Sequence, residues 1–211
     1  MARALKGTWI LYLALGLTST AWGQGQGQQP LIQQPSILGP VLSHPDVQKE
    51  LKLNDEQISK LKDVLNKVME KYRDDFTKLP RMSLEEQQKT MKALMEDSHK
   101  AIAGVLDAKQ WKRLKQIEWQ MAGVNALQDP ELQKELKLSE EQKKKLDDIF
   151  NDTSKKLQQM LQNRETSQEK YQAVFKDLEE KANGVLNEQQ QKNLKELKGP
   201  LFHFSLPKTG R

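Results

Sequence analysis

The chain has 211 residues, of which 36% are hydrophobic and 30% are charged, with no cysteine and a net charge of +5 at pH 7. The lack of cysteine excludes disulfides, thiolate metal sites and a cysteine nucleophile, so packing must stabilise the fold. The lysines alternate with acidic residues, as they do on solvated helix faces. A nucleic-acid partner is therefore not expected, because such proteins gather positive charge on one surface.

Residues 1–23 have the pattern of a secretory signal peptide. Arg3 and Lys6 precede an apolar run that is shorter than the roughly 20 residues needed to span a membrane. Ala21 and Gly23 supply the small side chains that precede a cleavage site. We expect cleavage near Gly23 and export to the periplasm or the extracellular space. No second apolar segment of spanning length follows, so we expect no integral membrane segment.

Two segments outside the helical pattern are expected at the ends of the mature chain. Residues 24–43 are rich in Gln, Gly and Pro and have no helical period, which predicts a flexible arm. Residues 199–211 form a C-terminal tail in which Phe202, Phe204 and Leu206 alternate with other residues. Whether the arm and the tail dock on the helices is left open.

The region between these segments is a tandem repeat. Residues 45–61 return as residues 130–146 with eleven of seventeen positions identical, a shift of 85, and a second match near Gly104 and Gly184 has a shift of 80. Self-similarity of this kind indicates one supersecondary unit built twice. We place the first repeat at residues 44–128 and the second at residues 129–198.

One recurring phrase marks the expected helix starts. A leucine is followed by Asn, Asp or Ser and, three residues later, by glutamine, which is the spacing of a capping box. The residues concerned are Leu53, Asn54, Gln57, Leu106, Asp107, Gln110, Leu138, Ser139, Gln142, Leu186, Asn187 and Gln190.

The apolar spacing predicts the lengths of the helices between these caps. It predicts one helix of about 24 residues from Asn54 to the break at Leu79, then another from Ser83 to near Gly104. The second repeat shows the same pattern with a turn at residues 163–167. No strand signal occurs. The expected fold is all-α, with two pseudo-symmetric repeats of helical hairpins, each a short, long, long and medium helix, packed as a cradle or a bundle.

Few residues suggest chemistry. The chain has no glycine-rich phosphate loop and no strained serine elbow, so we expect neither an enzyme nor a cofactor. Glu96 and His99 have a spacing used in di-iron bundles, but the second repeat lacks it, and metal binding there is left open. Met91 and Met95 fit either a core or an adaptable client-binding surface. Trp119 lies off the apolar stripe of its helix and is expected at a rim or interface, which makes it a third candidate client-binding residue.

The capping phrase resembles the LTxxQ motif of the Spy/CpxP family of periplasmic stress proteins. Leucine and glutamine match at all four sites, and Asn, Asp or Ser replaces the threonine. The resemblance covers residues 45 to about 198. It implies helical hairpins arranged as a cradle that holds unfolded proteins without ATP, here in one tandem two-repeat chain.

Three functional hypotheses follow. The first is a chaperone-like, stress-associated protein that binds unfolded or partly folded proteins. The second is an adaptor or inhibitor that binds a single envelope protein partner, and the third is a structural helical spacer. The oligomeric state is left open.

Overall fold

The computed structural model describes residues 38–165 and 167–204. In these residues the chain forms ten α-helices and no strand, which confirms the all-α prediction. The first half contains α1 (Leu38–Ser43), α2 (Pro45–Glu50), α3 (Asp55–Lys71), α4 (Arg73–Lys78), the 3-10 helix η3 (Leu79–Arg81), α5 (Leu84–Ala103) and α6 (Ala108–Ala122). The second half contains the 3-10 helix η4 (Gly123–Gln128), α7 (Pro130–Glu135), α8 (Glu140–Gln162), α9 (Gln168–Gly184) and α10 (Glu188–Lys198).

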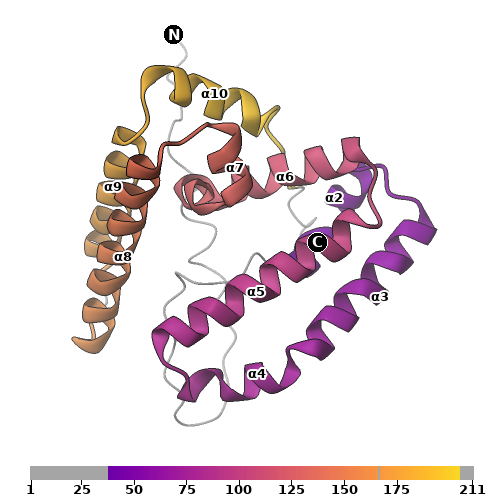
Figure 1. The fold of residues 1–211 in the computed structure, drawn as a ribbon, viewed down its shortest axis with the longest axis horizontal. Coiled ribbons are helices and arrows are strands. Elements are labelled where there is room, and N and C mark those ends of the chain that lie inside the picture. The colour runs from indigo at the N-terminus through magenta and orange to yellow at the C-terminus, as the bar shows by residue number, and fades with distance from the viewer. Residues whose placement is uncertain (1–37, 166, 205–211) are drawn as a thin grey trace, which may run out of the picture.

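The helices form two arms on a shared base (Figure 1). In the first arm α3 and α4 run antiparallel to α5, and in the second arm α8 runs antiparallel to α9. The base consists of α6, η4, α7 and α10, with α6 packed against both η4 and α10. Among the described residues, none of the extensive helix contacts joins one arm to the other, and the free ends of both arms lie on the same side of the base in Figure 1.

The long helix predicted after Asn54 is interrupted at Tyr72. The backbone of Tyr72 leaves the helical region, with φ −99° and ψ 6°, and serves both as the end of α3 and as the start of α4. Its hydroxyl donates a 2.8 Å hydrogen bond to Asp97 on α5, and its ring is buried. The prediction of one continuous helix was therefore wrong at this point, where Tyr72 packs against α5 and its backbone departs from helical geometry.

The turn of the second arm lies where the sequence predicts it. Between α8 and α9, Arg164 adopts a left-handed conformation with φ 52°, and the Ser167 side chain caps the start of α9. Arg164 turns the chain after α8, and the Ser167 side chain satisfies a backbone amide in the first turn of α9. The chain therefore returns to a helix within a few residues.

Two main buried clusters divide the molecule. One contains residues of α1, α2, α3, α5 and α6, and the other contains residues of η4, α7, α8 and α9 together with one residue of α6. Leu114 and Ile117 of α6 belong to the first cluster, whereas Trp119 belongs to the second. Because α6 supplies buried side chains to both clusters, it connects the two halves. A third, small cluster lies within the first arm.

Part of the predicted flexible arm is helical. Residues 38–43 form α1, and Leu38 and Leu42 are 2% and 3% exposed in the first cluster, so the arm prediction was wrong for these residues. The Leu42 carbonyl accepts from Gln48, as the Leu127 carbonyl accepts from Gln133 in the other half. The structural unit therefore begins before residue 44. The predicted signal peptide, residues 24–37 of the arm and Leu206 lie outside the described residues.

No helix in the described part of the chain is both long and apolar enough to cross a membrane.

Candidate functional site

All four predicted capping boxes form. The Asn54 side chain accepts from the Gln57 backbone N–H at 2.8 Å, and the Gln57 side chain accepts from the Asn54 backbone N–H at 3.3 Å. The same reciprocal bonds occur at the starts of α6, α8 and α10. These bonds satisfy backbone donors that a helix start otherwise leaves without partners.

The motif glutamines also bond to one another across helices. Gln57 Nε2 donates to Gln110 Oε1 at 2.7 Å, and Gln110 Nε2 donates back to Gln57 Oε1 at 3.1 Å. The same two nitrogens donate to the backbone carbonyls of Val105 and Leu51. Each glutamine thus ties its own helix start both to the other helix and to the loop that precedes it.

The second half repeats this arrangement. Gln142 and Gln190 exchange hydrogen bonds of 2.7 and 3.0 Å, and their nitrogens donate to the carbonyls of Val185 and Leu136. Gln190 is 7% exposed. Because every polar atom of these amides is bonded within the protein, the motif holds helices together and leaves no free group for a ligand. The motif leucines anchor the same joints: Leu106, Leu138 and Leu186 are buried and Leu53 is half-buried.

A buried ion network joins the two halves and was not predicted from the sequence. Lys115 on α6 is 1% exposed, and its ammonium lies 3.1 Å from Glu118 and 2.5 Å from Asp129, the residue that caps α7. The ring centroids of Trp111 and Trp119 lie 6.0 and 5.5 Å from the same ammonium. Trp111 and Trp119 lie four residues before and after Lys115 on α6, but a helix lysine is usually solvated, so its burial was not predicted.

The network keeps both members of its central pair charged. Burial is the largest single influence on the Lys115 pKa and lowers it, because it disfavours the charged ammonium. The Glu118 and Asp129 carboxylates together outweigh burial, so the Lys115 pKa is raised. Burial is also the largest single influence on the Asp129 pKa and raises it, because it favours the neutral carboxyl. The Lys115 ammonium, the Leu132 backbone N–H and the Trp119 indole oppose it and lower the Asp129 pKa.

Trp119 is not a rim residue. It is 6% exposed in the second cluster, so the prediction that it lies at a rim or interface was wrong. The side of α6 that carries Trp119 is covered by η4, α7, α8 and α9, which the stripe on α6 alone does not reveal. Its indole Nε1 has no hydrogen bond of standard length and geometry within the described structure.

The two methionine candidates lie on the first arm. Met91 packs half-buried against the small cluster formed by Val68, Tyr72 and Leu94. Met95, one turn later on α5, is also half-buried, and none of the three clusters includes it. Met91 therefore packs against the core of the first arm, whereas Met95 packs against none of the three clusters.

His99 has partners other than Glu96. Its Nε2 lies 3.3 Å from Glu118 Oε1, and its ring makes an edge contact with Trp111 at 5.6 Å. Glu96 is exposed. Within residues 38–165 and 167–204, no group of three or more histidines and carboxylates is arranged to hold a metal ion.

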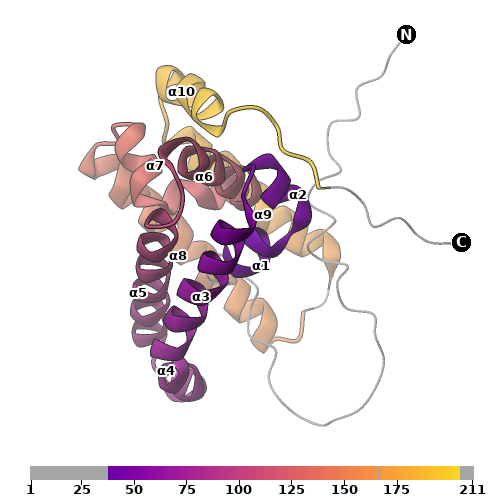
Figure 2. The same cartoon turned by 90° about the vertical axis from the view of Figure 1, so that its right-hand side faces the viewer.

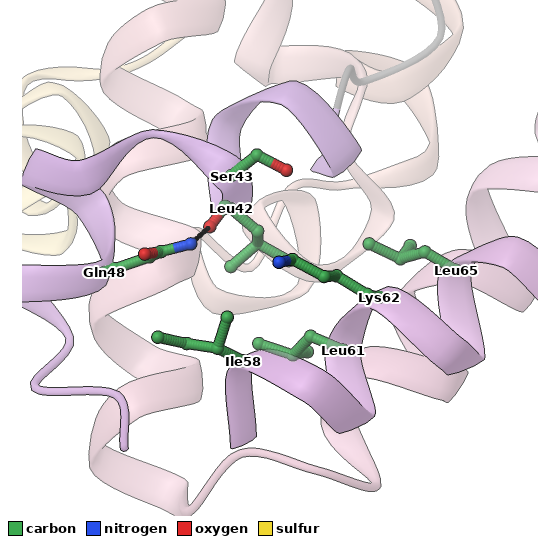
Figure 3. A pocket seen from close by; sticks show the side chains of 7 residues that line it. All are labelled: Leu42, Ser43, Gln48, Ile58, Leu61, Lys62 and Leu65. Carbon is green, nitrogen blue, oxygen red and sulfur yellow. Dashed lines mark hydrogen bonds between the residues drawn. The ribbon is translucent and has the colours of Figure 1, made fainter. Parts of the chain in front are cut away.

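Two pockets of the described surface are small. One lies between α1, α2 and α3, where Ile58, Leu61 and Leu65 face Leu42 (Figure 3), and has a volume of about 10 Å³. That is about the space of one water molecule. The other lies beneath η4, has a volume of about 100 Å³, and includes Lys198, whose pKa burial lowers. Both are smaller than the roughly 300 Å³ at which small-molecule sites begin.

No protein-family model matches this chain, and neither curated proteins nor solved structures include one with significant similarity to it.

Proposed function

We propose that this protein is an exported, non-enzymatic, chaperone-like protein that binds unfolded or partly folded polypeptides between or along its two arms. The observation that carries the proposal is the pair of hairpin arms on one base. A hairpin of two helices can bury only the sides that face each other, so the remaining sides are open to a partner.

Half-exposed apolar side chains on the arms support this proposal. Met69 on α3 is 51% exposed, and Met91 and Met95 on α5 are half-buried. Methionine adapts to apolar partners of different shapes, because its side chain is unbranched and polarizable. Charged residues surround these positions, and charges at a rim speed encounter more than they add affinity.

The sequence features add to the same proposal. Residues 1–23 have the pattern of an export signal, and the capping phrase resembles the LTxxQ motif. In this protein the motif glutamines join helices, so the client surface is assigned to the arms and not to the motif.

The test is an aggregation assay with the chain from Gln24 to Arg211. We expect equimolar protein to slow the aggregation of several unrelated unfolded proteins without nucleotide or metal. Met95→Gln is expected to weaken protection several-fold with little change in melting temperature, because Met95 lies outside the clusters. Met91→Gln is expected to lower both the protection of clients and the melting temperature.

Met121→Gln is the matched control, since Met121 is 46% exposed on α6 in the base and not on an arm. It is expected to leave protection unchanged. If the wild-type protein protects none of the clients, the chaperone proposal fails. A single-partner envelope adaptor is then the better hypothesis, and pull-down of one stoichiometric partner would identify it.

A further inference from the structure

The C-terminal segment crosses from the second half of the molecule back to the first. After α10 ends at Lys198, residues 199–204 have no regular secondary structure and pass along α6 toward α2 (Figure 2). Gly199 makes the turn with φ 64° and ψ −164°, a conformation almost restricted to glycine. A Cβ at Gly199 would lie 2.5 Å from the Gln116 side chain, so the segment runs close to α6.

Side chains of α6 bind the main chain of this segment. Gln120 Nε2 donates to the carbonyls of Lys198 and Pro200 at 2.5 and 2.9 Å, and Gln120 Oε1 accepts from the Phe202 N–H at 2.8 Å. Arg113 also donates to the Pro200 carbonyl, at 2.9 Å. Arg113 is held in place by a 2.7 Å ion pair with Glu50 on α2. These bonds are made to main-chain atoms, so they do not depend on which side chains the segment carries.

The side chains of the segment alternate between two environments. Phe202 and Phe204 are half-buried against the first cluster, whereas Leu201 is 76% exposed and His203 is exposed. The Phe204 ring meets His44 edge-on at 4.7 Å, and the two phenylalanine rings meet at 4.9 Å. This period of two is that of an extended chain.

Backbone hydrogen bonds combined with apolar contacts at alternate side chains are how proteins bind extended peptides. We propose that the surface of α1, α2 and α6 that holds residues 200–204 is a binding site for extended polypeptide segments with aromatic side chains at alternate positions. The protein's own tail is its resident ligand. A client segment of the same pattern replaces the tail. That the replacing segment comes from an unfolded client rests on the proposed function, whereas the binding site is argued from the contacts of the tail alone.

The tail is suited to exchange. It contributes only half-buried rings, and no α-helix or capping box of the described structure lies within it. A tethered ligand has an effective concentration on the order of millimolar, so it competes with any peptide in solution. The site therefore binds an external peptide weakly while the tail is docked and more tightly when the tail is released.

The test uses the chain from Gln24 to Arg211 with Phe202→Ala and Phe204→Ala, which removes the apolar contacts of the tail without shortening it and is expected to release it. The probe is a fluorescently labelled, end-blocked peptide of residues 199–204, and its control carries alanine in place of both phenylalanines. Fluorescence anisotropy is expected to show the probe binding at least tenfold more tightly to the double variant than to wild type, and the control peptide binding to neither. Adding Gln120→Ala to the double variant is expected to remove most of the binding. Leu201→Ala, at an exposed position, is the matched control and is expected to behave as wild type.

Equal binding of the probe to wild type and double variant, or binding to neither, would overturn the proposal. If the double variant does not fold, as judged by circular dichroism and a thermal melt, hydrogen exchange in wild type decides. The probe and not the control peptide is then expected to accelerate exchange of the Phe202 amide, and unchanged exchange would overturn the site. Probe binding without protection of clients would retain the site and reject the chaperone proposal. Protection of clients without probe binding would reject the site alone.

Discussion

Lys115 lies 1% exposed between two indole rings, with the Asp129 and Glu118 carboxylates beside its ammonium. Removing one member of a buried ion pair leaves the other charge without compensation, which costs more than the pair itself contributes. Asp129 also caps α7 by accepting from the Glu131 and Leu132 backbone amides. One lysine therefore connects α6 of the first half to α7 of the second half.

Replacement of Lys115 by methionine is expected to lower the free energy of unfolding by about 3–5 kcal/mol. Methionine fills a similar volume but leaves the Asp129 and Glu118 carboxylates without their cation. The measurement is urea unfolding. Lys195 occupies the equivalent position 80 residues later and is exposed, so Lys195→Met is the control and is expected to change stability by less than about 0.5 kcal/mol. Equal effects at the two lysines would show that the network contributes nothing specific.

The stability difference between wild type and Lys115→Met is also expected to depend on pH. The lowered pKa of Asp129 contributes stability above the ordinary value of 3.8, and that contribution is lost as pH falls through the folded-state pKa. The raised pKa of Lys115 contributes stability below 10.5, and that contribution is lost only as pH rises through its higher folded-state pKa. The difference in unfolding free energy between wild type and Lys115→Met is therefore largest near neutral pH and becomes smaller in acid. A difference that stays constant from pH 7 to pH 3 would contradict the assignment.

At the scale of the helices, the glutamine pairs fix how α3 meets α6 and how α8 meets α10. A cap bond alone satisfies one helix start, whereas each glutamine amide bonds its own cap, a glutamine of another helix and a loop carbonyl. The buried amide of Gln190 loses two bonds if Gln142 is removed.

Gln142→Ala is expected to destabilise the protein by about 2–3 kcal/mol, because it leaves buried polar atoms unsatisfied in addition to removing a cap. Ser139→Ala at the same helix start is expected to cost about 1 kcal/mol, since it removes only the cap acceptor. Gln189→Ala, at an exposed residue of α10, is the control and is expected to cost under about 0.5 kcal/mol. Denaturant midpoints measure all three. If Gln142→Ala costs no more than Ser139→Ala, the pairing with Gln190 adds no stability.

At the scale of the whole molecule, the halves exchange side chains. Trp119 of the first half is buried in the second cluster, and Phe202 and Phe204 of the second half pack against the first cluster. Neither cluster is complete without residues from the other half, so the two halves are expected to unfold as one cooperative unit.

A fragment that ends at Gln128 is expected to be less cooperative than the whole chain, or to dimerise. It lacks Asp129, which pairs with Lys115, and also lacks the side chains that cover Trp119 and the tail that covers the first cluster. Thermal melts and sedimentation of the fragment measure both alternatives. A monomer that melts as sharply as the whole chain would mean that the halves are independent domains.

Local chemistry explains which features were predictable from the sequence. A capping box requires only residues three positions apart, and an apolar stripe requires only its own helix, so the helix starts at Asn54, Ser83, Asp107, Ser139 and Asn187 and the all-α class follow from the chain itself. The turn near Arg164 is local in the same way.

The remaining features depend on which distant segments meet. Gln57 meets Gln110 across 53 positions, and the tail reaches Gln120 across 82. Tyr72, at the break between α3 and α4, bonds Asp97 of another helix, and the burial of Lys115 and Trp119 depends on what covers the second side of α6. A side chain's neighbours along one helix specify its face but not what packs against that face. The amino-acid sequence by itself thus determined the helices and their ends, and only the tertiary structure decided which polar groups became buried partners and which surface the tail occupies.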